Sequence, residues 1–153
     1  MFVKAALHQL EIAIHSTILM LEQITYTELQ QRPLKNKRSL FEICTHLSLI
    51  CHADFLILNE ASKEELDTFY TQHTLHTLEE VHQTTKEGFQ LLSKAFQTYS
   101  LTELEEVTHS YWGASYSRFE WLLEIIAHFY HHRSQLHTLL AEHVKDPQIS
   151  LFE

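Results

Sequence analysis

Residues 124–136 read Glu-Ile-Ile-Ala-His-Phe-Tyr-His-His-Arg-Ser-Gln-Leu, and this stretch decides the fold. Its apolar side chains continue a spacing of three or four residues, which predicts one buried stripe along a helix. The stripe consists of Leu122, Ile125, Phe129, Leu136 and Leu139. His128 and His132 stand four residues apart, so on a helix they share one face and can bind a single metal ion. His132 falls near the middle of the stripe, where an imidazole needs a polar partner.

The composition favours long helices. The chain has 153 residues with two Gly and two Pro, so turn formers are scarce. This length is typical of one domain with a core of its own. We therefore expect a single all-α domain over residues 1–153.

Three capping boxes mark helix starts, each a Ser or Thr followed three residues later by Glu. They begin at Ser39, Thr77 and Ser117. With the apolar periodicity they predict four helices and no strand, and hence a four-helix bundle. The predicted helices span residues 2–29, 39–59, 77–98 and 118–142. The long connection 99–117 is rich in aromatic residues, which is typical of a packed lid or of a binding loop.

The charge excludes some partners. The net charge of −9 opposes sequence-independent binding to nucleic acid, which needs clustered Lys and Arg. The basic cluster at residues 32–38 is interpreted as a solvated loop. The N-terminus lacks a signal-peptide core, and no window is expected to span a bilayer. The sequence thus predicts a cytosolic protein that binds neither nucleic acid nor membrane.

Two cysteines in the second predicted helix stand seven residues apart, too far to bridge each other. Cys44 and Cys51 are expected to be buried as small apolar residues. The tail that ends in Leu151-Phe152 is apolar enough to dock on the domain or on a second subunit.

A metal site needs a third ligand from a facing helix. The second predicted helix offers His46 and His52, on opposite flanks of its apolar stripe. Periodicity does not choose between them. On spacing alone, a set of packed imidazoles without metal is also compatible with the sequence.

Two motifs carry a family resemblance. Residues 39–47 contain Glu-x-x-x-His, and residues 128–136 contain His-x-x-x-His-Arg-Ser-Gln. The chain resembles the DinB/YfiT-like superfamily of metal-binding four-helix bundles. The resemblance implies that His46, His128 and His132 bind a divalent metal, commonly zinc or nickel. It also implies a homodimer and similarity to thiol-dependent enzymes such as bacillithiol S-transferases.

One residue departs from the family motif. Ser134 occupies the position of a glycine. The larger side chain could narrow the approach of a neighbouring helix, so it puts pocket shape in question more than metal binding.

Three imidazoles leave a coordination position open for chemistry. The motif contains no Cys, so a nucleophilic thiol has to come from a small cosubstrate. Glu42 and Glu124, each one turn before a predicted ligand, are candidates to orient the rings, or else solvated charges. Gln135 is the candidate catalytic residue, whose amide orients substrate or bonds a neighbouring helix. Arg133 could hold a substrate carboxylate or form a surface ion pair.

The function predicted from these features is a divalent-metal-dependent enzyme that acts on a small molecule, with thiol S-transferase activity the first candidate. A non-catalytic metal- or ligand-binding protein on the same scaffold and a metal-dependent hydrolase are the alternatives. An open polar cleft beside the metal would favour an enzyme. A site plugged by Trp112 or Tyr116 would favour binding.

Overall fold

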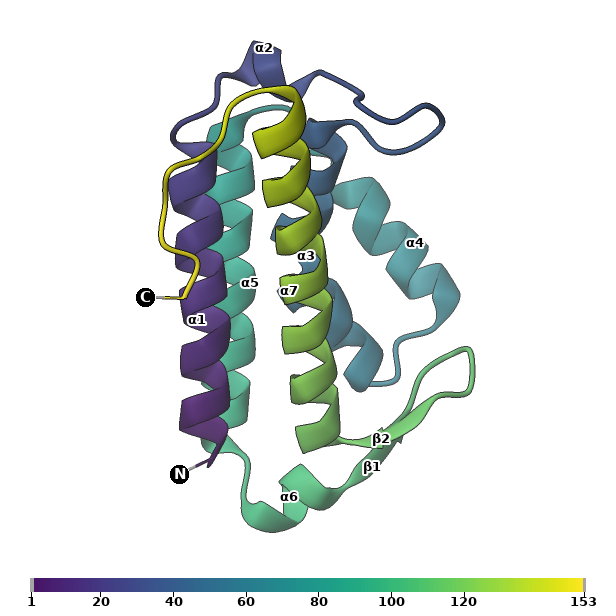
Figure 1. Cartoon of the computed structure of the whole chain (residues 1–153). Coiled ribbons are helices and arrows are strands. Elements are labelled where there is room, and N and C mark those ends of the chain that lie inside the picture. The colour runs from purple at the N-terminus through teal and green to yellow at the C-terminus, as the bar shows by residue number, and fades with distance from the viewer. Residues whose placement is uncertain (1, 153) are drawn as a thin grey trace.

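The computed structural model describes residues 2–152 and confirms the all-α four-helix bundle (Figure 1). The long helices are α1 (Phe2–Leu21), α3 (Leu40–Leu58), α5 (Leu78–Thr98) and α7 (Arg118–His143). The shorter elements are α2 (Tyr26–Leu29), α4 (Lys63–Gln72), α6 (Leu101–Glu105), β1 (Val107–His109) and β2 (Ser115–Ser117).

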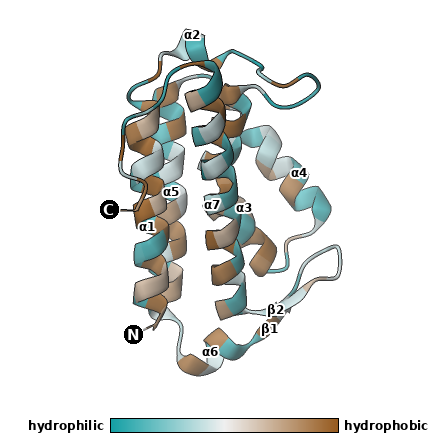
Figure 2. Cartoon of the chain, viewed as in Figure 1, coloured by the Kyte–Doolittle hydropathy of each residue, from teal (hydrophilic) through white to brown (hydrophobic). Residues whose placement is uncertain are grey.

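The four long helices pack in a ring in which α3 contacts α5 and α7, and α1 contacts the same two helices. Apolar and polar residues recur along each helix, as Figure 2 shows for α1 and α7. This spacing puts the apolar side chains on one side of the helix, which faces the core. Phe96, Trp121 and Phe129 are among the largest side chains buried in this core. The α3–α7 pair runs antiparallel (Figure 1), which places the middle of one helix opposite the middle of the other.

The three expected capping boxes are confirmed at Ser39, Thr77 and Ser117. In each, the hydroxyl accepts a hydrogen bond from the Glu backbone N–H while the Glu side chain accepts one from the cap. The same motif starts three further helices, at Thr25, Ser62 and Ser100. Local hydrogen bonds thus define most helix starts in the described chain.

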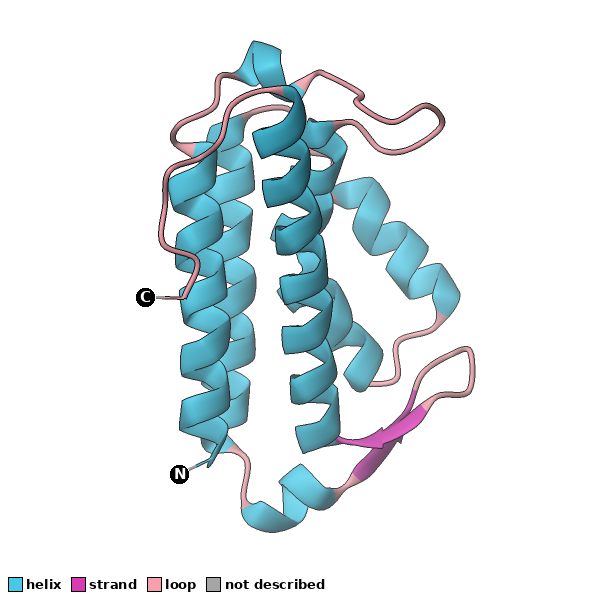
Figure 3. Cartoon of the chain, viewed as in Figure 1, coloured by secondary structure: helices cyan, strands magenta, loops and turns pink. Residues whose placement is uncertain are grey.

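The structure corrects the sequence prediction in three places (Figure 3). The first helix ends at Leu21 rather than at residue 29, because the Thr25 box begins α2. The second connection contains α4, whose buried Leu66 and Phe69 face the bundle. The third connection holds α6 and a β-hairpin, contrary to the expectation of no strand. In the hairpin, Thr108 pairs with Tyr116.

The sequence expectation that no segment could span a membrane is wrong as a statement of length and composition, because α3 passes that test. However, 61% of its apolar window is buried inside the bundle. Its apolarity is therefore that of a helix whose apolar side chains pack in the core of the bundle.

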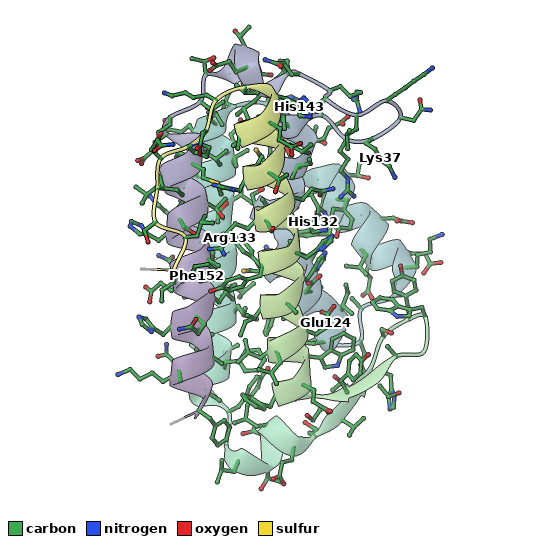
Figure 4. All side chains as sticks on the ribbon, in the orientation of Figure 1. Lys37, Glu124, His132, Arg133, His143 and Phe152 are labelled. Atoms are coloured by element: carbon green, nitrogen blue, oxygen red, sulfur yellow. The ribbon has the colours of Figure 1, made fainter. Side chains whose placement is uncertain are left out.

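The C-terminal tail docks on its own bundle through Arg133 (Figure 4). This arginine is 3% exposed, and neither expected role, substrate clamp nor surface ion pair, describes it. Its guanidinium donates to Ser16 Oγ at 2.9 Å and to the Leu151 carbonyl at 2.5 Å. It also lies over the ring of Tyr130, and the Phe152 ring covers it further. Arg133 therefore fastens α1 and the tail to α7.

We expect Arg133→Met to release the tail and to lower the free energy of unfolding by about 1–3 kcal/mol, because buried hydrogen bonds to a charged donor are lost. Hydrogen exchange should speed up at residues 148–152. Lys94→Met, which removes an exposed cation on α5, is the matched control and should change stability by less than about 0.5 kcal/mol. An unchanged exchange rate in the tail would contradict the anchoring role.

Candidate metal centre

Three histidines converge at the α3–α7 seam. One nitrogen from each of His46, His128 and His132 lies within 4.8 Å of the others. The ring centroid of His46 is 5.3 Å from that of His128 and 4.4 Å from that of His132. Because α3 and α7 are antiparallel, one turn of α7 presents two rings to the single ring of α3.

The spacing fits a shared metal ion. Two nitrogens that each lie about 2.1 Å from a tetrahedral zinc ion stand about 3.4 Å apart. His46 Nε2 and His128 Nε2 are 3.4 Å apart. That separation is longer than the usual range for a hydrogen bond from an N–H donor. The two nitrogens are therefore spaced as ligands of one ion are.

Asp54 orients the His128 ring. Its carboxylate accepts from His128 Nδ1 at 2.7 Å, and its side chain is 8% exposed. A proton fixed on Nδ1 leaves the Nε2 lone pair directed at the cluster, which is how carboxylates prepare histidine ligands. The sequence analysis does not identify Asp54, although an acidic residue deep inside the apolar run of α3, two turns after His46, is a signal for it.

Gln135 orients the His132 ring. Its Oε1 accepts from His132 Nδ1 at 3.1 Å, so the His132 Nε2 lone pair also remains available. The Gln135 side chain at the same time lines a cavity beside His132. Its contact is with the ring of a candidate ligand on its own helix and not with a neighbouring helix.

The surroundings hold two of the three imidazoles neutral. Burial, together with the charge of Arg38, lowers the pKa of His46 to about 3. Burial likewise lowers the pKa of His132. In His128 the hydrogen bond to Asp54 raises the pKa. Neutral imidazole is the form that binds metal, so His46 and His132 are ready as ligands at neutral pH.

Comparison with known proteins supports this fold. No protein-family model matches the chain, and no curated protein does. A solved structure from Exiguobacterium sibiricum, described as a candidate member of the DinB family, superposes with a TM-score of 0.83. The two are 26% identical, and the match covers 98% of this chain and 97% of that chain. The chain has a DinB-like fold. This confirms the resemblance noted in its sequence.

The two glutamates expected to orient the histidines do not do so. Glu42 accepts the Ser39 N–H at 2.6 Å and pairs with Arg32 at 2.9 Å, so it serves the start of α3. Glu124 lies close to Asp54 and His128, where burial and the nearby Asp54 raise its pKa. No hydrogen bond joins Glu124 to His128 among the described residues. Its carboxylate is left exposed at the edge of the cluster.

The remaining candidate site residues lie away from the three-histidine cluster. His52, the alternative third ligand, packs on Phe69 and His73 in the groove between α3 and α4. Cys44 and Cys51 are buried, as expected, and burial raises the pKa of Cys44 to about 12 and also raises that of Cys51.

Ser134, which replaces the motif glycine, is exposed on the outer side of α7. It lines a shallow groove with Tyr130 and His131 and does not line the cavity beside His132. The serine therefore leaves the shape of that cavity unchanged.

We expect Asp54→Asn to weaken zinc binding about 10- to 100-fold, because the neutral amide holds the His128 ring less firmly. Competition against a chromophoric chelator measures the affinity. Asp67→Asn, an exposed acid on α4, is the control and should leave zinc affinity unchanged. Wild-type affinity in Asp54→Asn would exclude the ring-orienting role.

In the metal-free protein we expect His46 to make stability depend on pH. Its folded pKa of about 3 lies below the ordinary value of 6.5, so the unfolded chain binds more protons between these limits. The stabilising contribution is present above pH 6.5 and is lost as the pH falls toward 3. The groups that face His46 are Arg38, His128 and His132.

Urea unfolding at several pH values tests this. His46→Gln should lose less stability than wild type as the pH falls, whereas His8→Gln, at an exposed position of α1, should follow wild type. Equal pH slopes in His46→Gln and wild type would show that the site does not hold His46 neutral.

Proposed function

We propose that His46, His128 and His132 hold a divalent metal, zinc or nickel, and that the protein is a metal-dependent enzyme of the thiol S-transferase type acting on a small molecule. The observation that carries this is the convergence of three imidazoles, two of which have their Nδ1 atoms engaged by Asp54 and Gln135. Side chains oriented in this way are typical of metal ligands.

The donor set favours a catalytic site over a structural one. Structural zinc sites use four protein ligands, whereas the cluster found among residues 2–152 offers three histidine nitrogens. A divalent ion with an open position lowers the pKa of a bound thiol or water, which supplies the nucleophile at neutral pH.

In the proposed function, the nucleophile is not a residue of this chain. Cys44 and Cys51 lie in the core, and their raised thiol pKa values keep them protonated. A small thiol cosubstrate is therefore required. We assign the exposed Glu124 carboxylate, at the edge of the cluster, as the acceptor of its proton. The Gln135 amide N–H groups are assigned to position the reacting molecule.

The aromatic hairpin leaves access to the site. Trp112 is 55% exposed, and Tyr116 packs on Trp121 with ring centroids 4.9 Å apart. Neither side chain lines the cavity beside His132. An accessible site favours the enzyme over a non-catalytic binding protein.

Three broader parts of the proposal concern the setting of the protein. We keep a cytoplasmic location and the absence of nucleic-acid partners as proposals, based on the acidic charge. The homodimer also stays a prediction. The Leu151 carbonyl is bound by Arg133 of the same chain, while Phe152 is 67% exposed and still offers apolar area.

The test is conjugation of small thiols to an electrophile by zinc- or nickel-loaded protein. We expect His132→Ala to lose metal binding and turnover together. Gln135→Glu keeps an acceptor for His132 but removes the amide donors, so it should retain metal while turnover falls about tenfold or more. His143→Ala, at the far end of α7 (Figure 4), should behave as wild type.

Loaded wild-type protein that accelerates neither thiol conjugation nor hydrolysis would favour the non-catalytic binding protein. Hydrolysis without conjugation would favour the hydrolase. Full activity in His132→Ala would place the chemistry outside this cluster.

A further inference from the structure

A cavity of about 210 Å³ adjoins the candidate metal centre. His132 and Gln135 of α7 form one side of it, and Lys37 and Arg38 of the loop before α3 form another. Leu34 is among the apolar side chains that complete the lining. Figure 4 shows Lys37 on the loop that passes beside α7 above His132. The cavity thus joins two cations to a candidate metal ligand.

The Arg38 side chain, which lines this cavity, has no protein partner in the described chain. Arg32, another cation of the loop, pairs at 2.9 Å with Glu42, the carboxylate of the capping box at the start of α3. Arg38 makes no ion pair or side-chain hydrogen bond with any residue in 2–152.

This placement is unusual for an acidic chain. The protein carries 20 acidic side chains against 11 Lys and Arg, and four of those cations fall within residues 32–38. Arg38 is exposed to solvent, and its side chain also lines the cavity that reaches His132.

We propose that this cavity binds the carboxylate of an anionic small thiol, with Arg38 as the residue that selects for the negative charge. The inference rests on the proposed thiol chemistry at the histidines. A guanidinium matches a carboxylate in planar, two-point geometry. Lys37 and the Gln135 amide line the same cavity as His132.

The size of the cavity limits the ligand. Its volume of about 210 Å³ corresponds to roughly seven water molecules at about 30 Å³ each. This suits a short aliphatic acid whose sulfur reaches the histidines. Arg38 thereby takes the carboxylate-binding role for which the buried Arg133 is unsuited.

The experiment compares two thiols of the same length on the cobalt(II)-loaded protein. These are 3-mercaptopropionate and neutral 3-mercaptopropanol, titrated at constant ionic strength. Thiolate-to-cobalt charge-transfer absorption gives the dissociation constant of each. We expect wild type to bind the carboxylate thiol about tenfold or more tightly than the alcohol.

Three variants locate the charge. Arg38→Gln should abolish the preference and leave the affinity for 3-mercaptopropanol unchanged. Arg38→Lys, which keeps the charge but loses the planar fork, should retain part of it. Lys35→Gln, a cation of the same loop that does not line the cavity, should keep the full preference.

Equal affinities in wild type, or a preference that survives Arg38→Gln, would overturn the inference while thiol binding still stands. Bound cobalt with no thiolate absorption would instead reject the proposed thiol function. In that case calorimetric titration of zinc-loaded protein with glutarate decides about the anion site. Binding that depends on Arg38 would support the site, and binding that is absent or independent of Arg38 would overturn it.

Discussion

The polar side chains buried along the α3–α7 seam must all be satisfied, and the structure around them follows from that constraint. An unpartnered imidazole or carboxylate in a helical core costs several kcal/mol or changes its protonation state. Asp54 and His128 satisfy each other at 2.7 Å, and Gln135 satisfies His132. The remaining ring nitrogens face one another, with His46 Nε2 and His128 Nε2 3.4 Å apart. A divalent cation matches such a set, because it accepts lone pairs from all three rings at once.

Helix starts were the most predictable part of the fold because they depend on short-range chemistry. A hydroxyl and a glutamate three residues apart supply both partners of the orphan N–H groups. The motif predicted the starts of α3, α5 and α7. It also occurs at the starts of α2, α4 and α6, which the sequence analysis does not identify. The hairpin is different. Its strands have three residues each and pair only with each other, so the sequence contains too little periodicity to show them.

The candidate site was predictable in part. The i, i+4 spacing placed His128 and His132 together, but periodicity left His46 and His52 equal. Packing separates them, because α4 covers the flank of α3 that carries His52, whereas α7 lies against the flank that carries His46. Long-range pairs such as Asp54 with His128 and Arg133 with the tail depend on which helices become neighbours. No local pattern contains that information.

Helix α7 presents two different faces. At about 100° per residue, His132 and Arg133 point in different directions although they are adjacent in the chain. Figure 4 shows His132 and Glu124 on the side toward α4, and Arg133 and Phe152 on the side toward α1. The first face stays accessible and polar, while the second is sealed by the tail. On the proposed function, a cation for the open face has to come from outside α7, because Arg133 holds the sealed face. Arg38, in the loop before α3, lines the cavity that reaches His132, so it is the residue that we propose for this role.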